Sequence, residues 1–305
     1  MHFLIRLPRI LLLILLLSRV SSCFAMEPRS ETAVEVALDN GALLPHQRRI
    51  TSELYSGGAP QNRAAFALLA SQGIKTVVSV DGTRPDLDAA RRYGLRYVHI
   101  PIGYGEIDAH ALLSIAQLVR SAETPFYIHC HRGLHRAPAV AAIASMAAGV
   151  FHSGDAIEIL ESAGTSEDYP GLWRSVTKYQ HPSEDCELPP LLEVAPIDTL
   201  KQGMAHISRL HQELRDYLDA SDNTDGASPN AKAIENANLI AESFREMRRQ
   251  HVSGDGAGFD EALKSSESIA WTLRDALSDQ DPSRVTKTVR MLTQSCVDCH
   301  RKHRD

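Results

Sequence analysis

The sequence lacks three features that would each indicate a familiar class of protein. It has no excess of positive charge, because 32 Lys and Arg residues stand against 38 Asp and Glu and give a formal net charge of −6. A nucleic-acid partner is therefore not expected, since its binding surface would be basic. The five cysteines in 305 residues do not form the dense, even-numbered pattern of a disulfide scaffold. The N-terminal apolar run at 10–17 has eight residues, too few for a spanning helix of about 20 residues.

Residues 1–25 are typical of an export signal. Arg6 and Arg9 precede the apolar run, which is the order of a secretory signal peptide. The stretch "VSSC" at 20–23 resembles a bacterial lipobox, in which Cys23 is acylated and becomes the new N-terminus. Simple cleavage after Ala25 is the alternative. Both interpretations predict a periplasmic protein, and the first also predicts a lipoprotein anchored to the membrane.

The rest of the chain favours two domains, which is also what its length suggests. Residues 26–50 have no clear periodicity and are expected to form a tether. Residues 51–180 alternate short β-type runs with helical stretches, and this alternation predicts an α/β domain with a mostly parallel sheet flanked by helices. The β-type runs are 74–80, 96–102 and 125–130, and the helical stretches between them are 62–73, 84–94 and 107–122.

The second domain is predicted to be all helical. Residues 181–196 contain four prolines and Cys186 and form a natural linker. Residues 197–305 then show four amphipathic helical segments with modest loops, which predicts an antiparallel four-helix bundle. The apolar positions at helical spacing are Leu200, Met204, Ile207, Leu214 and Leu218; Ile240, Phe244 and Met247; Leu263, Ile269 or Ala270, Leu273 and Leu277; and Val285, Val289, Leu292, Cys296 and Cys299.

The stretch "FYIHCHRGLHRAPAV" at 126–140 has the residue types of an anion site. Cys130 ends a β-type run, and Arg136 begins a helix after a loop of five residues. Such a junction directs backbone N–H groups and the positive end of a helix dipole at one spot. Gly133 allows the loop to curl inward, and Arg136 offers a bidentate fork to a tetrahedral oxyanion. Because the same positive field favours the thiolate form of Cys130, the loop both binds phosphate and supplies a nucleophile.

The segment "HCHRGLHR" resembles the His-Cys-x5-Arg signature of the protein tyrosine and dual-specificity phosphatase superfamily, and the resemblance spans roughly residues 51–180. It implies a cysteinyl-phosphate mechanism with Cys130 as nucleophile, Arg136 as phosphate binder and His129 as a group that tunes the thiolate. It also implies a phosphorylated protein or small molecule as substrate. The residues expected to line the phosphate site are His129, His131, Arg132, Gly133, Leu134, His135 and Arg136.

Two departures from the family bear on turnover. Ala137 stands where the family usually has a Ser or Thr that helps the thiolate leave. The general acid is expected on the loop at 100–108, where Glu106 and Asp108 are the candidates, and Asp81 at the end of another strand is a third. General acid help is typically worth about 10²–10⁴-fold. A pseudo-phosphatase that binds phosphate without turnover therefore stays an alternative, as do a sulfurtransferase loop and a cysteine that is only buried.

The segment "CVDCH" at 296–300 has the spacing of c-type haem attachment. In that interpretation Cys296 and Cys299 add to the haem vinyl groups and His300 ligates the iron. The rivals are a redox dithiol, which normally follows a strand in an α/β domain, and a zinc site. Zinc needs four tetrahedral ligands, which Cys296, Cys299, His300 and His303 on one helical stretch would supply badly.

Residues 197–305 also resemble cytochrome c′ and its relatives, which are four-helix bundles with the haem motif near the end of the last helix. The resemblance implies one covalent haem c, a second axial ligand on the first helix, a redox partner and a homodimer. Met204 is the candidate ligand, with His206 and His211 as alternatives. The whole sequence thus predicts an exported cysteine-dependent phosphatase coupled to a c-type haem. The alternative is a non-catalytic phosphate-binding module on an electron-transfer or gas-binding cytochrome.

Overall fold

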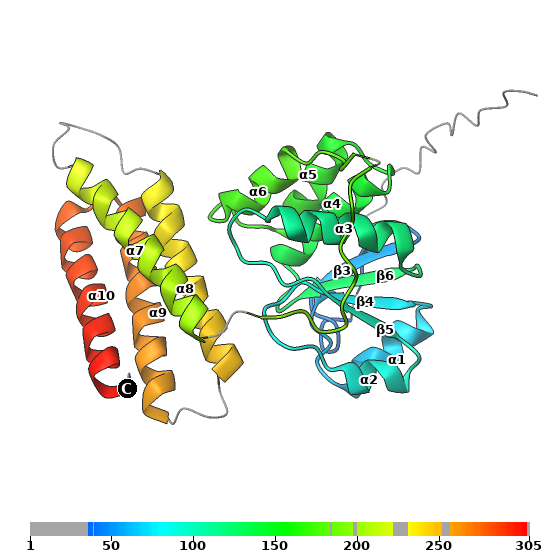
Figure 1. Cartoon of the computed structure of the whole chain (residues 1–305), viewed down its shortest axis with the longest axis horizontal. Helices are drawn as coiled ribbons and strands as arrows, with labels where there is room; N and C mark the ends of the chain where they lie inside the picture. Colours follow the sequence, from blue (N-terminus) through cyan, green and yellow to red (C-terminus); the bar gives the residue numbers. More distant parts are fainter. Residues whose placement is uncertain are drawn as a thin grey trace, which may run out of the picture. The chain divides into compact units, whose positions relative to one another are not determined.

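The computed structural model describes residues 36–38, 40–183, 185–197, 200–221, 231–251 and 257–303 (Figure 1). The expected export signal at 1–25, with Cys23, lies outside these residues, as does the first part of the expected tether. Among the described helices, none combines the length and apolarity needed to cross a membrane.

A six-stranded, mostly parallel sheet organises the first domain, in the strand order β1-β2-β3-β6-β4-β5. Strands β3, β6, β4 and β5 run parallel to one another, whereas β1 pairs antiparallel with β2, and β2 pairs antiparallel with β3. Because parallel strands end at the same edge of a sheet, the segments that follow β4, β5 and β6 meet there. The strands are β1 Val36–Ala37, β2 Arg48–Arg49, β3 Leu54–Gly58, β4 Thr76–Ser79, β5 Arg96–His99 and β6 Phe126–Cys130.

Helices cover both faces of the sheet, as the alternation of strands and helices predicts. Figure 1 shows α1 and α2 on one face and α3 to α6 on the other. Helix α4 packs at the centre of its layer because its residues are small and apolar, and every residue from Arg136 to Met146 is buried. The bounds are α1 Arg63–Ser71, α2 Leu87–Arg92, α3 Ala109–Ser121, α4 Arg136–Ala147, α5 Ser153–Ala163 and α6 Pro170–Thr177.

The sheet begins earlier in the chain than the sequence pattern indicates. Strands β1 and β2 lie within residues 26–50, and Leu44 between them is fully buried in a cluster with Tyr55 and Tyr127. This corrects the expected domain boundary at residue 51. Strands of two residues are too short to show periodicity, and the two glycines of β3 weaken its strand signal.

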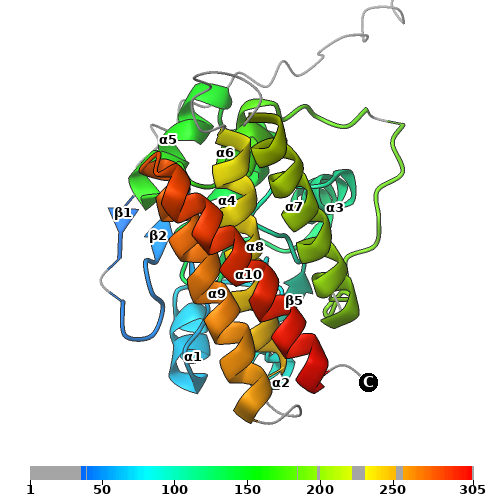
Figure 2. The ribbon, with the colours of Figure 1, turned by 90° about the vertical axis from the view of Figure 1, so that its left-hand side faces the viewer.

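The second domain consists of four long helices that pack side by side, as both views show (Figures 1 and 2). They are α7 Leu200–Ser221, α8 Ala231–His251, α9 Ala257–Ser278 and α10 Pro282–His303. The apolar positions that predict these helices lie in the bundle core or pack against it, except Cys296. Asp281 caps α10 by accepting the N–H of Arg284 over 3.0 Å, with Pro282 at the first helical position. The fold class, an α/β domain followed by a helical bundle, is confirmed.

The proline-rich linker follows the edge strand β5. The N–H of His99 donates to the carbonyl of Leu192 over 2.8 Å, and the N–H of Ala195 donates to His99 Nδ1 over 3.2 Å. The other ring nitrogen, Nε2, therefore carries the proton and donates to the carbonyl of Asp81 over 2.8 Å. In this way the linker and β5 fix the backbone at the end of β4.

Candidate phosphate-binding site

The loop at 131–135 curls around the thiol of Cys130 as its spacing predicts. The N–H of Gly133 donates to Cys130 Sγ over 3.3 Å. Gly133 has a φ of 81°, and an added Cβ would lie 2.3 Å from the backbone of Gly57 and Gly58. Glycine is required here both by the left-handed conformation and by the close approach of two backbones.

The carbonyl groups of this loop are satisfied by groups outside it. The carbonyl of His131 accepts the N–H of Ala59 over 3.1 Å, and the carbonyl of Leu134 accepts the hydroxyl of Thr165 over 2.8 Å. These two acceptors therefore bond to neighbouring segments, while the N–H of Gly133 is directed at the thiol of Cys130. A backbone N–H at this position favours an anion there.

Arg136 is fixed at the first position of α4. Its side chain is 1% exposed, and its guanidinium donates to the carbonyl of Ile102 over 3.2 Å and to the hydroxyl of Tyr104 over 3.3 Å. The guanidinium also lies 4.4 Å from the centre of the Tyr104 ring. Its Nε is buried without a hydrogen-bond partner. An unpaired buried donor costs about 1–3 kcal/mol, so this N–H is a ready contact for an anionic ligand.

The histidines around the loop are neutral at pH 7. Burial, above all, lowers the pKa of His129 to about 4, and its Nε2 lies 2.6 Å from the hydroxyl of Tyr97. Burial and then the charge of Arg136 lower the pKa of His135 to about 4. His135 Nδ1 accepts the N–H of Ser166 over 3.3 Å. His129 and His135 therefore shape the loop through packing and hydrogen bonds, while His131 and Arg132 are exposed.

Glu106 and Asp108, both predicted acids, have other partners. The carboxylate of Glu106 accepts Arg174 Nε over 2.7 Å, and this hydrogen bond lowers the pKa of Glu106. Asp108 accepts the N–H of Ala111 over 2.8 Å and so caps α3, the role that Asp favours before a helix. Both line the cavity beside Arg136, but neither is bonded to Cys130 or Arg136.

Asp81, the third candidate, does reach the site. It is buried, one oxygen lies 3.7 Å from the guanidinium of Arg136, and the other lies 2.7 Å from that of Arg249. Burial by itself would raise the pKa of Asp81, but the charges and hydrogen bonds of these two arginines outweigh it and hold the pKa well below its usual range. Asp81 is therefore ionised at neutral pH and serves as a counterion.

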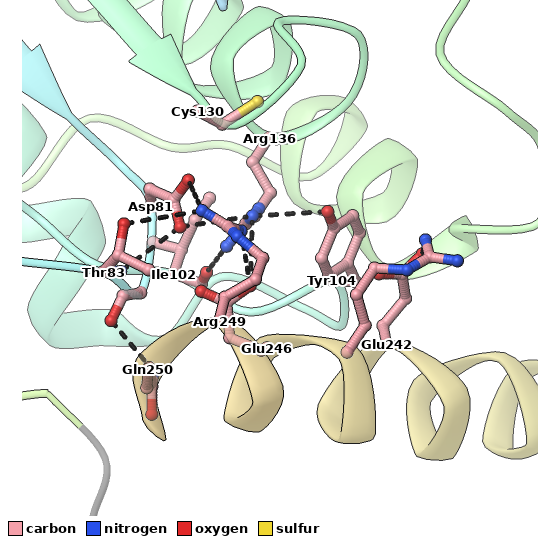
Figure 3. Close-up of polar contacts among 12 residues, drawn as sticks. Asp81, Thr83, Ile102, Tyr104, Cys130, Arg136, Glu242, Glu246, Arg249 and Gln250 are labelled. Carbon is pink, nitrogen blue, oxygen red and sulfur yellow. Dashed lines mark hydrogen bonds and ion pairs between the residues drawn. The ribbon is translucent and has the colours of Figure 1, made fainter. Parts of the chain in front are cut away.

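A further acidic residue at the site comes from the bundle and was not predicted. Glu246, on α8, places one oxygen 3.6 Å from the guanidinium of Arg136 and 3.0 Å from that of Arg249. Figure 3 shows Glu246 and Arg249 extending from α8 toward Asp81 and Arg136. Within the sequence, Glu246 and Arg249 look like an ordinary pair three residues apart on a helix surface, so no signal linked them to Cys130.

A cavity of about 960 Å³ lies beside these charges, and Arg136, Tyr104 and Glu246 contribute to its walls. Helices α8 and α9 also bond to the α/β domain around it. These bonds join Tyr169 to Glu242 at 2.7 Å, Asn238 to the carbonyl of Asp168 at 2.8 Å, Gln250 to the carbonyl of Gly82 at 3.0 Å, Arg274 to Asp168 at 2.7 Å and Arg174 to Glu235 at 2.8 Å.

The "CVDCH" motif lies in the last two turns of α10. Both cysteines are free thiols, with Cys296 half-buried and Cys299 buried, and burial raises the pKa of each. His300 is exposed and lies four residues after Cys296, on the same helix face. Two thiols one turn apart with an adjacent exposed imidazole are the donor set of covalent haem attachment, so the residues fit this group.

The residues predicted to face the haem lie on α7. Met204 is half-buried and packs against the bundle core. His211 Nε2 lies 3.3 Å from the hydroxyl of Thr293, which shows that α7 and α10 run beside each other. Across the described ranges, no group of three or more His, Cys, Asp or Glu side chains is arranged to hold a metal ion. The zinc alternative thus finds no ligand cluster there.

Comparison with known proteins gives structural neighbours only. No protein-family model and no curated protein matches the chain. Among solved structures, TpbA of P. aeruginosa is 23% identical with a TM-score of 0.43, over 49% of this chain and 92% of that one. A DUF442 protein from Shewanella putrefaciens CN-32 is 20% identical with a TM-score of 0.38, over 47% and 96%. PTPMT1, in complex with PI(5)P, is 15% identical with a TM-score of 0.37, over 43% and 92%. The activity of this chain is therefore inferred from its own residues.

Proposed function

We propose that this chain is a cysteine-dependent phosphatase that hydrolyses phosphomonoesters through a cysteinyl-phosphate on Cys130. The observation that carries the proposal is the loop that holds both reacting groups. Its Gly133 N–H donates to Cys130 Sγ over 3.3 Å, and the Nε of the buried Arg136 has no partner. A thiol that accepts a loop N–H, beside an arginine whose buried Nε has no partner, can bind a phosphoryl group and attack it.

The reaction has two steps. In the first, Cys130 Sγ attacks phosphorus and the bond to the leaving oxygen breaks, while the loop N–H groups, the N-terminus of α4 and Arg136 stabilise the phosphoryl oxygens. In the second, water attacks the cysteinyl-phosphate, releases inorganic phosphate and regenerates the thiolate. Ala137 brings no hydroxyl to help the thiolate leave, so we expect the second step to be the slower one.

A second candidate is a phosphate-binding module without turnover. The observation that favours it is the environment of Arg136, which lies 3.7 Å from Asp81 and 3.6 Å from Glu246. Carboxylates beside a guanidinium compete with a phosphate for it. Cys130 is also only 3% exposed, which limits the approach of a large substrate.

Hydrolysis of an aryl phosphate by the full chain and by Cys130→Ser separates these candidates. The phosphatase predicts thiol-dependent turnover that falls to background in the variant. In parallel, inorganic phosphate should protect Cys130 of the unaltered chain from alkylation by iodoacetamide. Protection without turnover would favour the binding module, and the absence of both would refute both candidates.

We also propose that α10 carries one covalent haem c. Cys296 and Cys299 would hold it through thioether bonds, His300 would ligate its iron, and Met204 is the candidate for the second ligand. The haem iron, when bound, supplies electron-transfer or gas-binding chemistry. A redox partner and a homodimer belong to the same proposal.

The haem proposal is tested by extraction with acidified acetone after expression with a haem-attachment system. Haem should stay with the unaltered polypeptide on a denaturing gel and be lost from the Cys296→Ser, Cys299→Ser double variant. Loss of haem from both would show that attachment is not covalent. A Met204→Ala variant should keep the haem but alter its absorption spectrum.

Export to the periplasm completes the proposal, with Cys23 as a lipid-anchor site. The mass of the mature protein distinguishes the two forms of processing. A chain that begins with acylated Cys23 would be a membrane-anchored lipoprotein, whereas one that begins at Met26 would be released by simple cleavage after Ala25. A chain that keeps residues 1–25 would contradict both.

A further inference from the structure

We propose that Glu246, on α8 of the helical bundle, is the general acid for phosphoester cleavage at Cys130. The proposal rests on the phosphatase function proposed above and assigns the general acid of that reaction. The three acids that the sequence suggests have other roles. Asp81 is the counterion of Arg249, Glu106 pairs with Arg174, and Asp108 caps α3.

The position of Glu246 suits this role. One of its oxygens lies 3.6 Å from the guanidinium of Arg136, the group that would hold the phosphoryl oxygens. Both residues line the same cavity of about 960 Å³, which offers space for the leaving group of the ester. Figure 3 shows Arg136 between Cys130 and Glu246. A phosphoryl group bound by Arg136 would therefore have the thiol near one side and the carboxyl of Glu246 near another.

The carboxyl of Glu246 packs against Gly82 of the α/β domain. Gly82 follows Asp81, and a Cβ added to Gly82 would lie 2.5 Å from Glu246 Oε1. The side chain of any other residue would displace the carboxyl. Gln250 lies one turn after Glu246 on α8, and its Nε2 donates to the carbonyl of Gly82 over 3.0 Å. This bond holds α8 against Gly82.

The groups around Glu246 favour its protonated form. It faces Asp81 at the end of β4, Tyr104 on the loop after β5, Arg136 on α4 and Arg249 on its own helix. Burial is the largest influence and raises its pKa, Asp81 raises it further, and the two arginines lower it; the result is about 7. A carboxyl that holds its proton near the working pH suits general acid catalysis.

Glu246 donates a proton in the first step and takes one back in the second. As the bond between Cys130 Sγ and phosphorus forms, the bond between phosphorus and the leaving oxygen breaks, and the Glu246 proton passes to that oxygen to give the free alcohol or phenol. Glu246 is then a carboxylate. When water attacks the cysteinyl-phosphate, Glu246 takes a proton from it, the bond between sulfur and phosphorus breaks, and the Cys130 thiolate returns with inorganic phosphate.

The same contact also has an opposite interpretation, in which the Glu246 carboxylate occupies Arg136 and blocks phosphate. The two interpretations differ in the effect of Glu246→Gln. Removal of an acid slows the reaction, and the loss grows as the leaving group becomes less acidic. Removal of a blocking charge accelerates the reaction for every leaving group and strengthens phosphate binding.

The test measures kcat/KM, which reports the first step, for a series of aryl and alkyl phosphates with the full chain, Glu246→Gln and the matched control Glu242→Gln, one turn earlier on α8. We expect Glu246→Gln to lower kcat/KM by about 10²–10⁴-fold for alkyl esters and far less for nitrophenyl phosphate, because nitrophenolate leaves without being protonated. Glu246→Asp should recover part of the loss. Glu242→Gln should show no dependence on the leaving group.

Three results for Glu246→Gln would overturn the proposal: an unchanged kcat/KM, a higher kcat/KM, or an equal loss of kcat/KM for all esters. If the unaltered chain hydrolyses nothing, the phosphatase function fails and Glu246 has no acid role. If it hydrolyses esters through Cys130 but Glu246→Gln keeps the same leaving-group profile, only the acid assignment fails. Should Glu246→Gln not fold, Gly82→Ala keeps the glutamate but displaces its carboxyl, and it must give the same leaving-group signature.

Discussion

The two domains hold their cysteines in opposite ways. Cys130 ends a buried strand, is 3% exposed and is surrounded by groups that come from several separate elements. Cys296 and Cys299 lie near the end of one helix, and their expected haem ligand His300 is the next residue in the chain. The first site is therefore a product of tertiary structure, whereas the second is a product of helical spacing alone.

This difference has a consequence for how the sites depend on each other. The bundle supplies Glu246 and Arg249 to the surroundings of Arg136, whereas α10, which carries Cys296 and His300, packs against α9 within the bundle. Changes in the bundle should thus alter chemistry at Cys130, while changes at the Cys130 loop should leave the "CVDCH" motif as it is.

The largest effect is expected from Gly133→Ala. The left-handed conformation costs an alanine roughly 1–2 kcal/mol, and the overlap at 2.3 Å with the backbone of Gly57 and Gly58 should add about 1–3 kcal/mol for overpacking. The N–H that bonds to Cys130 would also shift. We expect turnover at background level, haem content unchanged, and a free energy of unfolding lower by about that sum, measured by urea denaturation.

Gly149→Ala is the matched control for this variant. Gly149 has a similar φ of 68°, but nothing lies within 4 Å of an added Cβ, so only the conformational cost of roughly 1–2 kcal/mol should appear. Turnover should be unaffected. If the two alanine variants behaved alike, the close backbone approach at Gly133 would not be what shapes the loop.

The next effect is a pH dependence of stability that arises from Glu246. Its pKa rises from the ordinary glutamate value of 4.5 to about 7 in the folded chain, through burial first and Asp81 next. The folded state therefore binds more protons than the unfolded state between these two pH values, and the free energy of unfolding should fall as pH rises from about 4.5 to 7. We expect the free energy of unfolding to fall by about 1–3 kcal/mol over this range. Glu246→Gln should abolish this dependence on pH.

Asp81 gives a contribution of opposite sign in a separate pH range. Because its folded pKa lies well below the usual value, its stabilisation is fully present above about pH 4 and is lost as pH falls further. Denaturation curves collected from pH 3 to 8 for the unaltered chain and Glu246→Gln separate the two groups. A difference between the proteins that did not change between pH 4.5 and 7 would contradict the assignment of a raised pKa to Glu246.

The parts of the molecule that can be predicted from sequence are those with local signals. Cys130, Gly133 and Arg136 occur within seven residues, and each residue type has a physical reason at its position. The four bundle helices follow from apolar spacing, which the core confirms. Strand β3 and the short strands before it escape prediction because few residues and two glycines leave little pattern.

The acid proposed here could not be predicted because it depends on contact between domains. Glu246 lies in a helix whose sequence indicates only an amphipathic surface, and its partner Arg249 forms the kind of pair common on helices. The N-cap role of Asp108, by contrast, can be predicted from the sequence, because an Asp directly before a helical stretch is a typical N-cap. Local sequence therefore directs attention to "GYGEID" at 103–108, whereas the carboxyl that lies beside Arg136 on α8 has no local signal at all.

The smallest effect is expected from Glu106→Gln. Glu106 is 57% exposed and pairs with Arg174, which is 37% exposed, and exposed pairs of this kind contribute about 0–1 kcal/mol. Arg174 keeps Glu235 as a second partner at 2.8 Å. We expect kcat/KM within about twofold of the unaltered chain for alkyl and nitrophenyl esters alike, since no proton transfer is removed. A loss confined to poor leaving groups would place the acid in the α/β domain, on the loop at 100–108 that the sequence indicates. The chemistry at Cys130 would then need no acid from the bundle.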